Sequence, residues 1–222
     1  MNIENNLKNL ENEALNSLFI GNVDNTKYLC NNLLTQSIIE NNKYYEASSY
    51  GILGYMFYEA ELYHEAINYL LKAISISNEA DRGYIDNGHL ALCYSKLNDL
   101  DNANLYVDKA INSAIELNNH PGKYEWFNFK GNLLYKLKLY DQALEWVEKS
   151  INEITFLITP DKPEIIFYMP YLTKYEIYCE LGLKNECIVL ENKLKEFFIP
   201  IQNPIMHLKR DKKKFLKLLN SV

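Results

Sequence analysis

The sequence predicts an all-α protein, a right-handed α-solenoid of about five antiparallel helix pairs that ends in a C-terminal capping helix. Three observations lead to this fold class. The 222 residues include only 8 glycines and 6 prolines, which favours long uninterrupted helices over an all-β fold. A hydrophobic fraction of 48% is ample for a continuous core. Finally, one register of small and large residues recurs along the chain, as stacked repeats require.

The clearest repeat lies between Ala47 and Ala80. Gly54 and Ala66 lack bulk where two antiparallel helices would approach each other. Large side chains fill the volume around that contact, namely Tyr50, Leu53, Phe57 and Leu70. This stretch therefore predicts one tightly packed helix pair at 47–80.

Four further repeats are expected in an array that covers residues 1–198. They lie near 7–40, 84–118, 124–158 and 168–198. Repeat three carries Ala91 in place of the motif glycine, and repeat four keeps Gly131 and Ala143 in register. Repeat five has Tyr175 at the glycine position, so its two helices are expected to splay or shift. The first repeat is degraded, as a terminal repeat with one unpartnered face can be.

The end of the chain differs from the array in both backbone and charge. Residues 199–204 contain two prolines, which predict a break between helices. Residues 205–222 are expected to form a basic amphipathic helix, with six basic residues against one acidic residue. Its apolar residues would cover the open end of the array, as a solenoid requires. Its basic face is either the solvated side of this cap or a surface that contacts nucleic acid, an anionic membrane or an acidic partner.

The spacing in 47–80, aromatic-x2-Leu-Gly-x2-aromatic followed by Ala-x3-large, resembles the tetratricopeptide repeat (TPR) pattern. The repeats are longer than the usual TPR period of about 34 residues, which is similar to the long-repeat arrays of bacterial TPR proteins. The resemblance implies a groove lined by the first helices of successive repeats. Its motif positions predict these groove residues: Tyr55, Tyr58, Glu59, Ser95, Lys96, Asn128, Asn132, Tyr135, Lys136 and Glu176.

This groove composition suits an extended peptide, because Asn amides pair with backbone groups and Tyr supplies contact area at low entropy cost. The resemblance therefore implies a non-enzymatic protein–protein interaction module that binds a peptide or protein segment, as an adaptor, scaffold or chaperone-like protein. The alternative is a peptide-sensing regulatory receptor of the bacterial TPR type, which would act through a partner protein.

No set of residues has the spacing of a catalytic or metal site, and none suggests a cofactor. The four histidines fall in different repeats, and no phosphate-binding glycine motif is present. Cys179 and Cys187 are eight residues apart, which predicts that they lie on opposite sides of a helix turn. All four cysteines are expected to be reduced and mostly buried. These patterns argue against an enzyme.

The net charge of −6 argues against specific nucleic-acid binding, and no stretch resembles a membrane span or a secretory signal. The protein is therefore expected to be cytoplasmic. Pairing of the acidic array with the basic tail of a second copy would give a homodimer. Asn-Asn doublets, such as Asn41-Asn42 and Asn118-Asn119, look more like an AT-rich coding bias than a functional choice.

Overall fold

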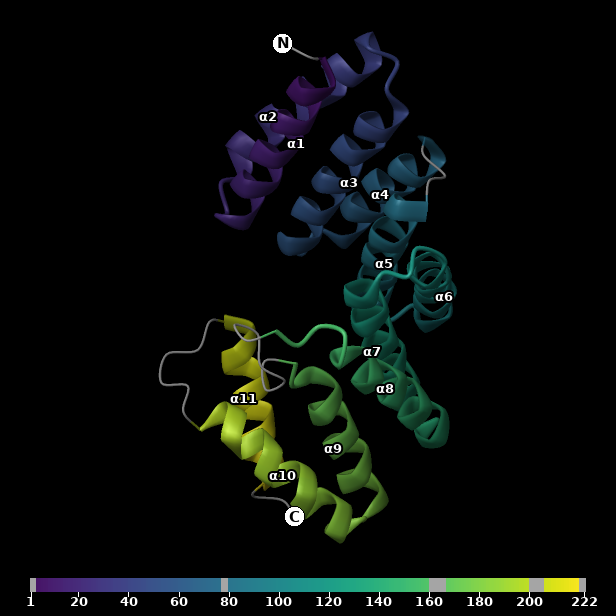
Figure 1. Ribbon diagram of the computed structural model, residues 1–222, viewed down its shortest axis with the longest axis vertical. Helices are drawn as coiled ribbons and strands as arrows, with labels where there is room; N and C mark the ends of the chain where they lie inside the picture. The colour runs from purple at the N-terminus through teal and green to yellow at the C-terminus, as the bar shows by residue number, and fades with distance from the viewer. Residues whose placement is uncertain (1–2, 77–79, 160–166, 200–205, 220–222) are drawn as a thin grey trace. The chain divides into compact units, whose positions relative to one another are not determined.

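A computed structural model describes residues 3–76, 80–159, 167–199 and 206–219 of the chain. Eleven α-helices occupy most of these described residues: α1 (Ile3–Phe19), α2 (Val23–Ile39), α3 (Lys43–Glu59), α4 (Tyr63–Ile76), α5 (Ala80–Lys96), α6 (Leu100–Glu116), α7 (His120–Lys136), α8 (Tyr140–Ile154), α9 (Met169–Leu181), α10 (Lys184–Phe198) and α11 (Met206–Leu219). They form two compact units, unit 1 (Met1–Gly122) and unit 2 (Lys123–Val222) (Figure 1). Within the described ranges, no helix combines the length and apolar character that crossing a bilayer requires.

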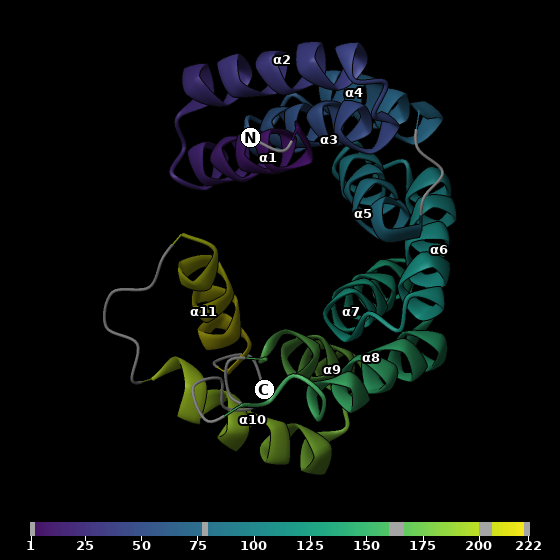
Figure 2. The same cartoon turned by 45° about the horizontal axis from the view of Figure 1, so that its top comes forward.

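Unit 1 consists of three helix pairs in two layers. Helices α1, α3 and α5 form one layer, and α2, α4 and α6 form the other (Figure 2). Consecutive helices from α1 to α6 pack on one another. This arrangement of adjacent antiparallel pairs confirms the predicted all-α solenoid.

Close contact within the helix pairs explains the motif glycines. A Cβ atom on Gly54 would lie 2.6 Å from Cγ of Leu70, across the contact between α3 and α4. A Cβ atom on Gly131 would lie 2.6 Å from Cγ2 of Val147, across the contact between α7 and α8. Both distances are shorter than carbon atoms tolerate, so the same register demands glycine in both pairs.

Asparagine doublets at two helix–helix turns have a structural role. Asn41 and Asn118 follow the ends of α2 and α6 with φ of 52° and 48°, a left-handed conformation that Asn tolerates better than most residues. Asn42 then caps α3 by accepting from the backbone N–H of Tyr45 at 3.3 Å. Asn119 likewise accepts from the backbone N–H of Gly122 at 2.8 Å. A coding bias is therefore not needed to explain these two doublets.

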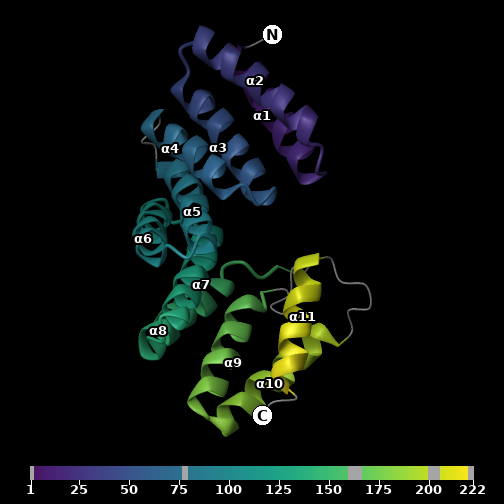
Figure 3. The same cartoon turned by 180° about the vertical axis from the view of Figure 1, so that it is seen from behind.

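Unit 2 ends in a helix that covers its core. α11 lies beside α9 and α10 (Figure 3). The Phe215 side chain of α11 is fully buried, with ring centres 5.4 Å from Phe198 and 5.7 Å from Tyr175. Tyr168 also donates a hydrogen bond from its hydroxyl to Asp211 Oδ2 at 2.8 Å. α11 thus acts as the predicted capping helix, and Tyr175 fills the glycine position with a buried ring.

The predicted break at 199–204 lies outside the described residues, except for Ile199. The same holds for residue 205 and for 220–222 of the predicted terminal helix.

Candidate binding site

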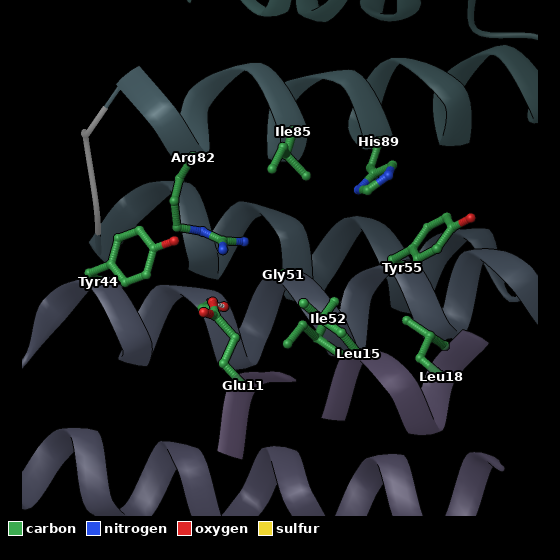
Figure 4. Close-up of a pocket in the computed structure, with 11 residues that line it drawn as sticks. Glu11, Leu15, Leu18, Tyr44, Gly51, Ile52, Tyr55, Arg82, Ile85 and His89 are labelled. Atoms are coloured by element: carbon green, nitrogen blue, oxygen red, sulfur yellow. Dashed lines mark hydrogen bonds between the residues drawn. The ribbon is translucent and has the colours of Figure 1, made fainter. Parts of the chain in front are cut away.

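The first helices of unit 1 line a cavity of about 190 Å³, called the first-helix cavity below. Side chains from α1, α3 and α5 point toward one another around it (Figure 4). Its lining residues are Glu11, Leu15, Leu18, Tyr44, Ser48, Gly51, Ile52, Tyr55, Arg82, Ile85 and His89. Since an apolar cavity of about 150 Å³ can hold benzene, this volume suits one large side chain rather than a drug-sized ligand.

A buried ion pair forms the charged end of the cavity. Arg82 donates from Nε to Asp86 Oδ2 at 3.1 Å and from Nη2 to Asp86 Oδ1 at 2.9 Å. The two side chains are 8% and 2% exposed. Gly51 on α3 provides the space, because a Cβ atom there would lie 2.2 Å from Arg82 Nη2 and 2.6 Å from Asp86 Oδ1. The geometry of this ion pair therefore depends on a glycine of the neighbouring helix.

Arg82 keeps its charge in this buried position. Burial is the largest single effect on the pKa of Arg82 and lowers it, but the charge and hydrogen bonds of Asp86, together with smaller effects from Tyr44 and Glu11, outweigh burial. The pKa of Arg82 is consequently raised above its usual value. The guanidinium also lies 5.9 Å from the ring centre of Tyr44, within reach of a cation–π contact.

Glu11 extends from α1 toward the same end of the cavity (Figure 4). Its Oε1 accepts a hydrogen bond from the buried hydroxyl of Ser48 on α3. The ion pairs among the described residues do not include Glu11, which is half-buried. Because Arg82 and Asp86 neutralise each other, Glu11 gives the charged end an excess of one negative charge.

Aromatic rings form the opposite end of the cavity. The rings of Tyr55 on α3 and His89 on α5 stack with centres 4.4 Å apart (Figure 4). Burial, assisted by the positive charge of Arg82, lowers the pKa of His89 to about 4. His89 is therefore neutral at physiological pH, and this end of the cavity carries no charge.

The predicted groove residues of unit 1 are only partly brought together. Tyr55 lines the first-helix cavity, and Tyr58 stacks on it with ring centres 6.0 Å apart. Glu59 is exposed at the end of α3, beside a second cavity of about 220 Å³. Ser95 is half-buried and Lys96 is exposed, both at the end of α5.

In unit 2, two predicted asparagines contact the next first helix. Asn132 Nδ2 donates to the Thr173 hydroxyl oxygen at 3.0 Å, and it lies 3.5 Å from Asn128 Oδ1. The Thr173 hydroxyl in turn donates to Asn128 Oδ1 at 3.4 Å. The two asparagines do lie side by side as expected, but their amides take part in packing between α7 and α9. A bound peptide would compete with these hydrogen bonds.

The other predicted residues of unit 2 differ in exposure and in the partners that they contact. Glu176 is 3% exposed and forms an ion pair with Lys214 of α11. Tyr135 packs on Tyr140 with ring centres 6.0 Å apart, and burial raises its pKa to about 12. Lys136 is exposed at the end of α7.

Sequence reasoning missed the charged end of the first-helix cavity. Arg82 precedes the predicted start of repeat three, and Glu11 lies in the degraded first repeat, so neither occupies a recognised motif position. One signal was present, because an Arg and an Asp four residues apart on a helix can pair, as Arg82 and Asp86 do. Nothing in the sequence showed that Gly51 would face this pair.

The prediction for two cysteines was wrong. Cys179 and Cys187 lie on either side of the turn between α9 and α10, with their sulfur atoms 3.6 Å apart. Gly182 reverses the chain between them with φ of 68°, so an eight-residue separation becomes a contact. Elsewhere in the described residues, no three His, Cys, Asp or Glu side chains gather as metal ligands would.

The fold and the first-helix cavity together define a helical-repeat protein with a small cavity among its first helices. A family model described as tetratricopeptide repeat matches residues 47–79, which include most of α3 and α4. No curated protein matches the sequence. The repeat match and the fold confirm the predicted resemblance to tetratricopeptide repeat proteins.

Several solved structures have the same fold. BtubC (BKLC) from P. vanneervenii is 13% identical, with a TM-score of 0.73 over 93% of this chain and 96% of that one. PilF of Pseudomonas aeruginosa is 14% identical, with a TM-score of 0.57 over 98% and 99% of the two chains. YrrB, described as a TPR protein with an unusual peptide-binding site, is 15% identical, with a TM-score of 0.55 over 96% and 98%. At such low identities these similarities establish the fold alone.

Proposed function

We propose that this chain is a protein-interaction module that binds an extended segment of a partner protein on the layer formed by α1, α3 and α5. One partner side chain inserts into the first-helix cavity. Tetratricopeptide repeats form scaffolds for protein–protein interaction in general, and the similarity to YrrB adds a peptide-binding relative in fold. The observation that carries the proposal is the cavity itself, whose volume of about 190 Å³ suits a side chain.

The aromatic residues beside the cavity support the same proposal. Tyr55 lines the cavity, and the adjacent half-buried Tyr58 extends its aromatic surface along α3. Tyrosines supply large contact areas with few rotatable bonds, which keeps the entropic cost of binding low. Among the predicted groove residues, we therefore assign these two to partner contact.

The test is selection of random 12-residue peptides displayed on phage against the full chain. Peptides that are enriched would then be synthesised and measured by fluorescence polarisation. A Leu15→Trp variant places an indole in the cavity, and Asn16→Trp places the same group on the exposed side of α1. We expect Leu15→Trp to weaken binding at least tenfold and Asn16→Trp to leave it unchanged. The absence of enriched peptides, or equal binding by both variants, would overturn the proposal.

A further inference from the structure

The charged end of the first-helix cavity discriminates between ligands of opposite charge. Arg82 is the cation of the cavity, but Asp86 occupies its Nε and Nη2 donors, and both side chains are almost fully buried. Three of the five N–H donors of Arg82 remain, but an anionic ligand that reaches them also meets the negative charges of Asp86 and Glu11, which repel it. The cavity is therefore poorly suited to an acidic side chain.

Glu11, by contrast, is suited to pair with a cationic ligand. Its carboxylate accepts one hydrogen bond from Ser48 through Oε1, and an ionised carboxylate has acceptor sites on both oxygens. It is half-buried, so a cation that reaches it from solvent pays only part of the desolvation cost. With Arg82 and Asp86 neutralising each other, and with His89 neutral, the remaining charge of the cavity is that of Glu11.

The middle of the cavity would accommodate an aliphatic stem. Leu15, Ile52 and Ile85 lie between the charged and aromatic ends (Figure 4). Lysine and arginine combine a flexible apolar stem with a terminal cation, and they commonly bury the stem along apolar surface. The charge balance of unit 1 points the same way, since its sequence contains sixteen acidic residues and seven basic residues.

We infer that the first-helix cavity binds a lysine or arginine side chain from a basic segment of a partner protein. Its cationic head pairs with Glu11, and its stem contacts Leu15, Ile52 and Ile85. This inference rests on the proposed function and specifies the chemistry of the inserted side chain. Electrostatic attraction to unit 1 would speed association with such a segment and make it sensitive to salt.

The test uses small probes and methyl NMR on the full chain with labelled isoleucine and leucine methyl groups. The probes are Nα-acetyl-arginine amide, Nα-acetyl-lysine amide and the uncharged Nα-acetyl-norleucine amide. We expect the basic probes to shift the Ile52 and Ile85 signals saturably, with norleucine amide binding about tenfold more weakly. Glu11→Gln keeps an oxygen that can accept from Ser48 but removes the charge, so it should remove this preference. Glu13→Gln removes the same charge from an exposed site on α1 and should preserve it.

The inference is overturned if norleucine amide binds as tightly as the basic probes, or if Glu11→Gln binds them as wild type does. Binding of norleucine amide alone would leave the cavity as a side-chain pocket and refute only its basic specificity. If none of the probes shifts these signals and no displayed peptide is enriched, the inference and the proposed function both fail. Enriched peptides that bind in a Leu15-dependent way but lack basic residues would refute the inference alone.

Discussion

The capping role of α11 leads to a quantitative prediction for Phe215→Ala. Phe215 is fully buried, and aromatic rings of Tyr175 and Phe198 bound it at 5.7 Å and 5.4 Å between centres. Removing a buried Phe side chain typically costs about 3–5 kcal/mol. We expect a value in the upper half of this range, because the lost ring contacts add to the loss of burial and the bulky neighbours resist collapse.

The assay is hydrogen exchange measured by mass spectrometry, combined with denaturant unfolding followed by circular dichroism. Exchange in α9 and α10 should accelerate by roughly a hundredfold or more, since each 1.4 kcal/mol corresponds to about a factor of ten. The matched control is Leu216→Ala, the next residue on α11, which is 41% exposed. A Phe215→Ala variant that loses no more stability than Leu216→Ala would refute the reasoning that α11 completes the core of unit 2.

Four further predictions follow from packing, capping and burial. Gly54→Ala should destabilise the protein by about 1–3 kcal/mol in denaturant unfolding, because the added methyl group overlaps a side chain of α4. Asn42→Ala should cost about 1 kcal/mol in the same assay, through loss of the α3 N-cap. His89 binds its proton more weakly in the folded protein, mainly through burial, with a pKa of about 4 instead of 6.5. The neutral His89 therefore contributes its full stability above pH 6.5, and this contribution, at most about 3 kcal/mol, is lost as the pH falls toward 4. Over this pH range, wild type should lose more stability than His89→Gln. Burial raises the pKa of the Cys179 thiol to about 12, so iodoacetamide should label it far more slowly at pH 8 than a model thiol.

Each of these predictions has a control or a contrary outcome. Ser75→Ala and Asn31→Ala change exposed helix positions and should alter stability by no more than about 0.5 kcal/mol. If Gly54→Ala or Asn42→Ala behaves like these controls, the packing or the cap is misassigned. Parallel pH profiles for wild type and His89→Gln would contradict the lowered pKa of His89. Labelling of Cys179 in the native protein as fast as in denaturant would contradict its burial.

The fold class predicted from the sequence agrees with the observed fold because the sequence patterns that specify helix pairs are local. The contact between α3 and α4 needs a glycine and an alanine at fixed spacing within one helix pair, and Gly54 and Ala66 meet that need within thirteen consecutive residues. Helix ends are equally local, although the role of Asn41 and Asn42 in a left-handed turn and an N-cap was not recognised. Such signals depend on a few neighbouring residues, so these features can be predicted without knowledge of the tertiary structure.

The candidate site was much less predictable. Tyr55 was predicted from its motif position, but Glu11 and Arg82, which line the opposite end of the same cavity, lie 44 residues before and 27 residues after it in the sequence. Asn128 and Asn132 show the reverse case, because their motif positions predict the groove but not the hydrogen bonds that they form with Thr173. Motif positions indicate which face of a helix a residue occupies, but not which side chain of the next helix it contacts.

The sequence by itself determined the helix pairs, their small-residue contacts and the basic amphipathic helix near the end of the chain, because periodicity and spacing encode these features locally. Only the tertiary structure decided that Gly51 makes room for the Arg82–Asp86 pair, that Cys179 and Cys187 touch, and that Lys214 pairs with Glu176. The physical reason is that these contacts depend on how neighbouring helices are rotated and offset. That packing is set by many side chains at once rather than by any single motif.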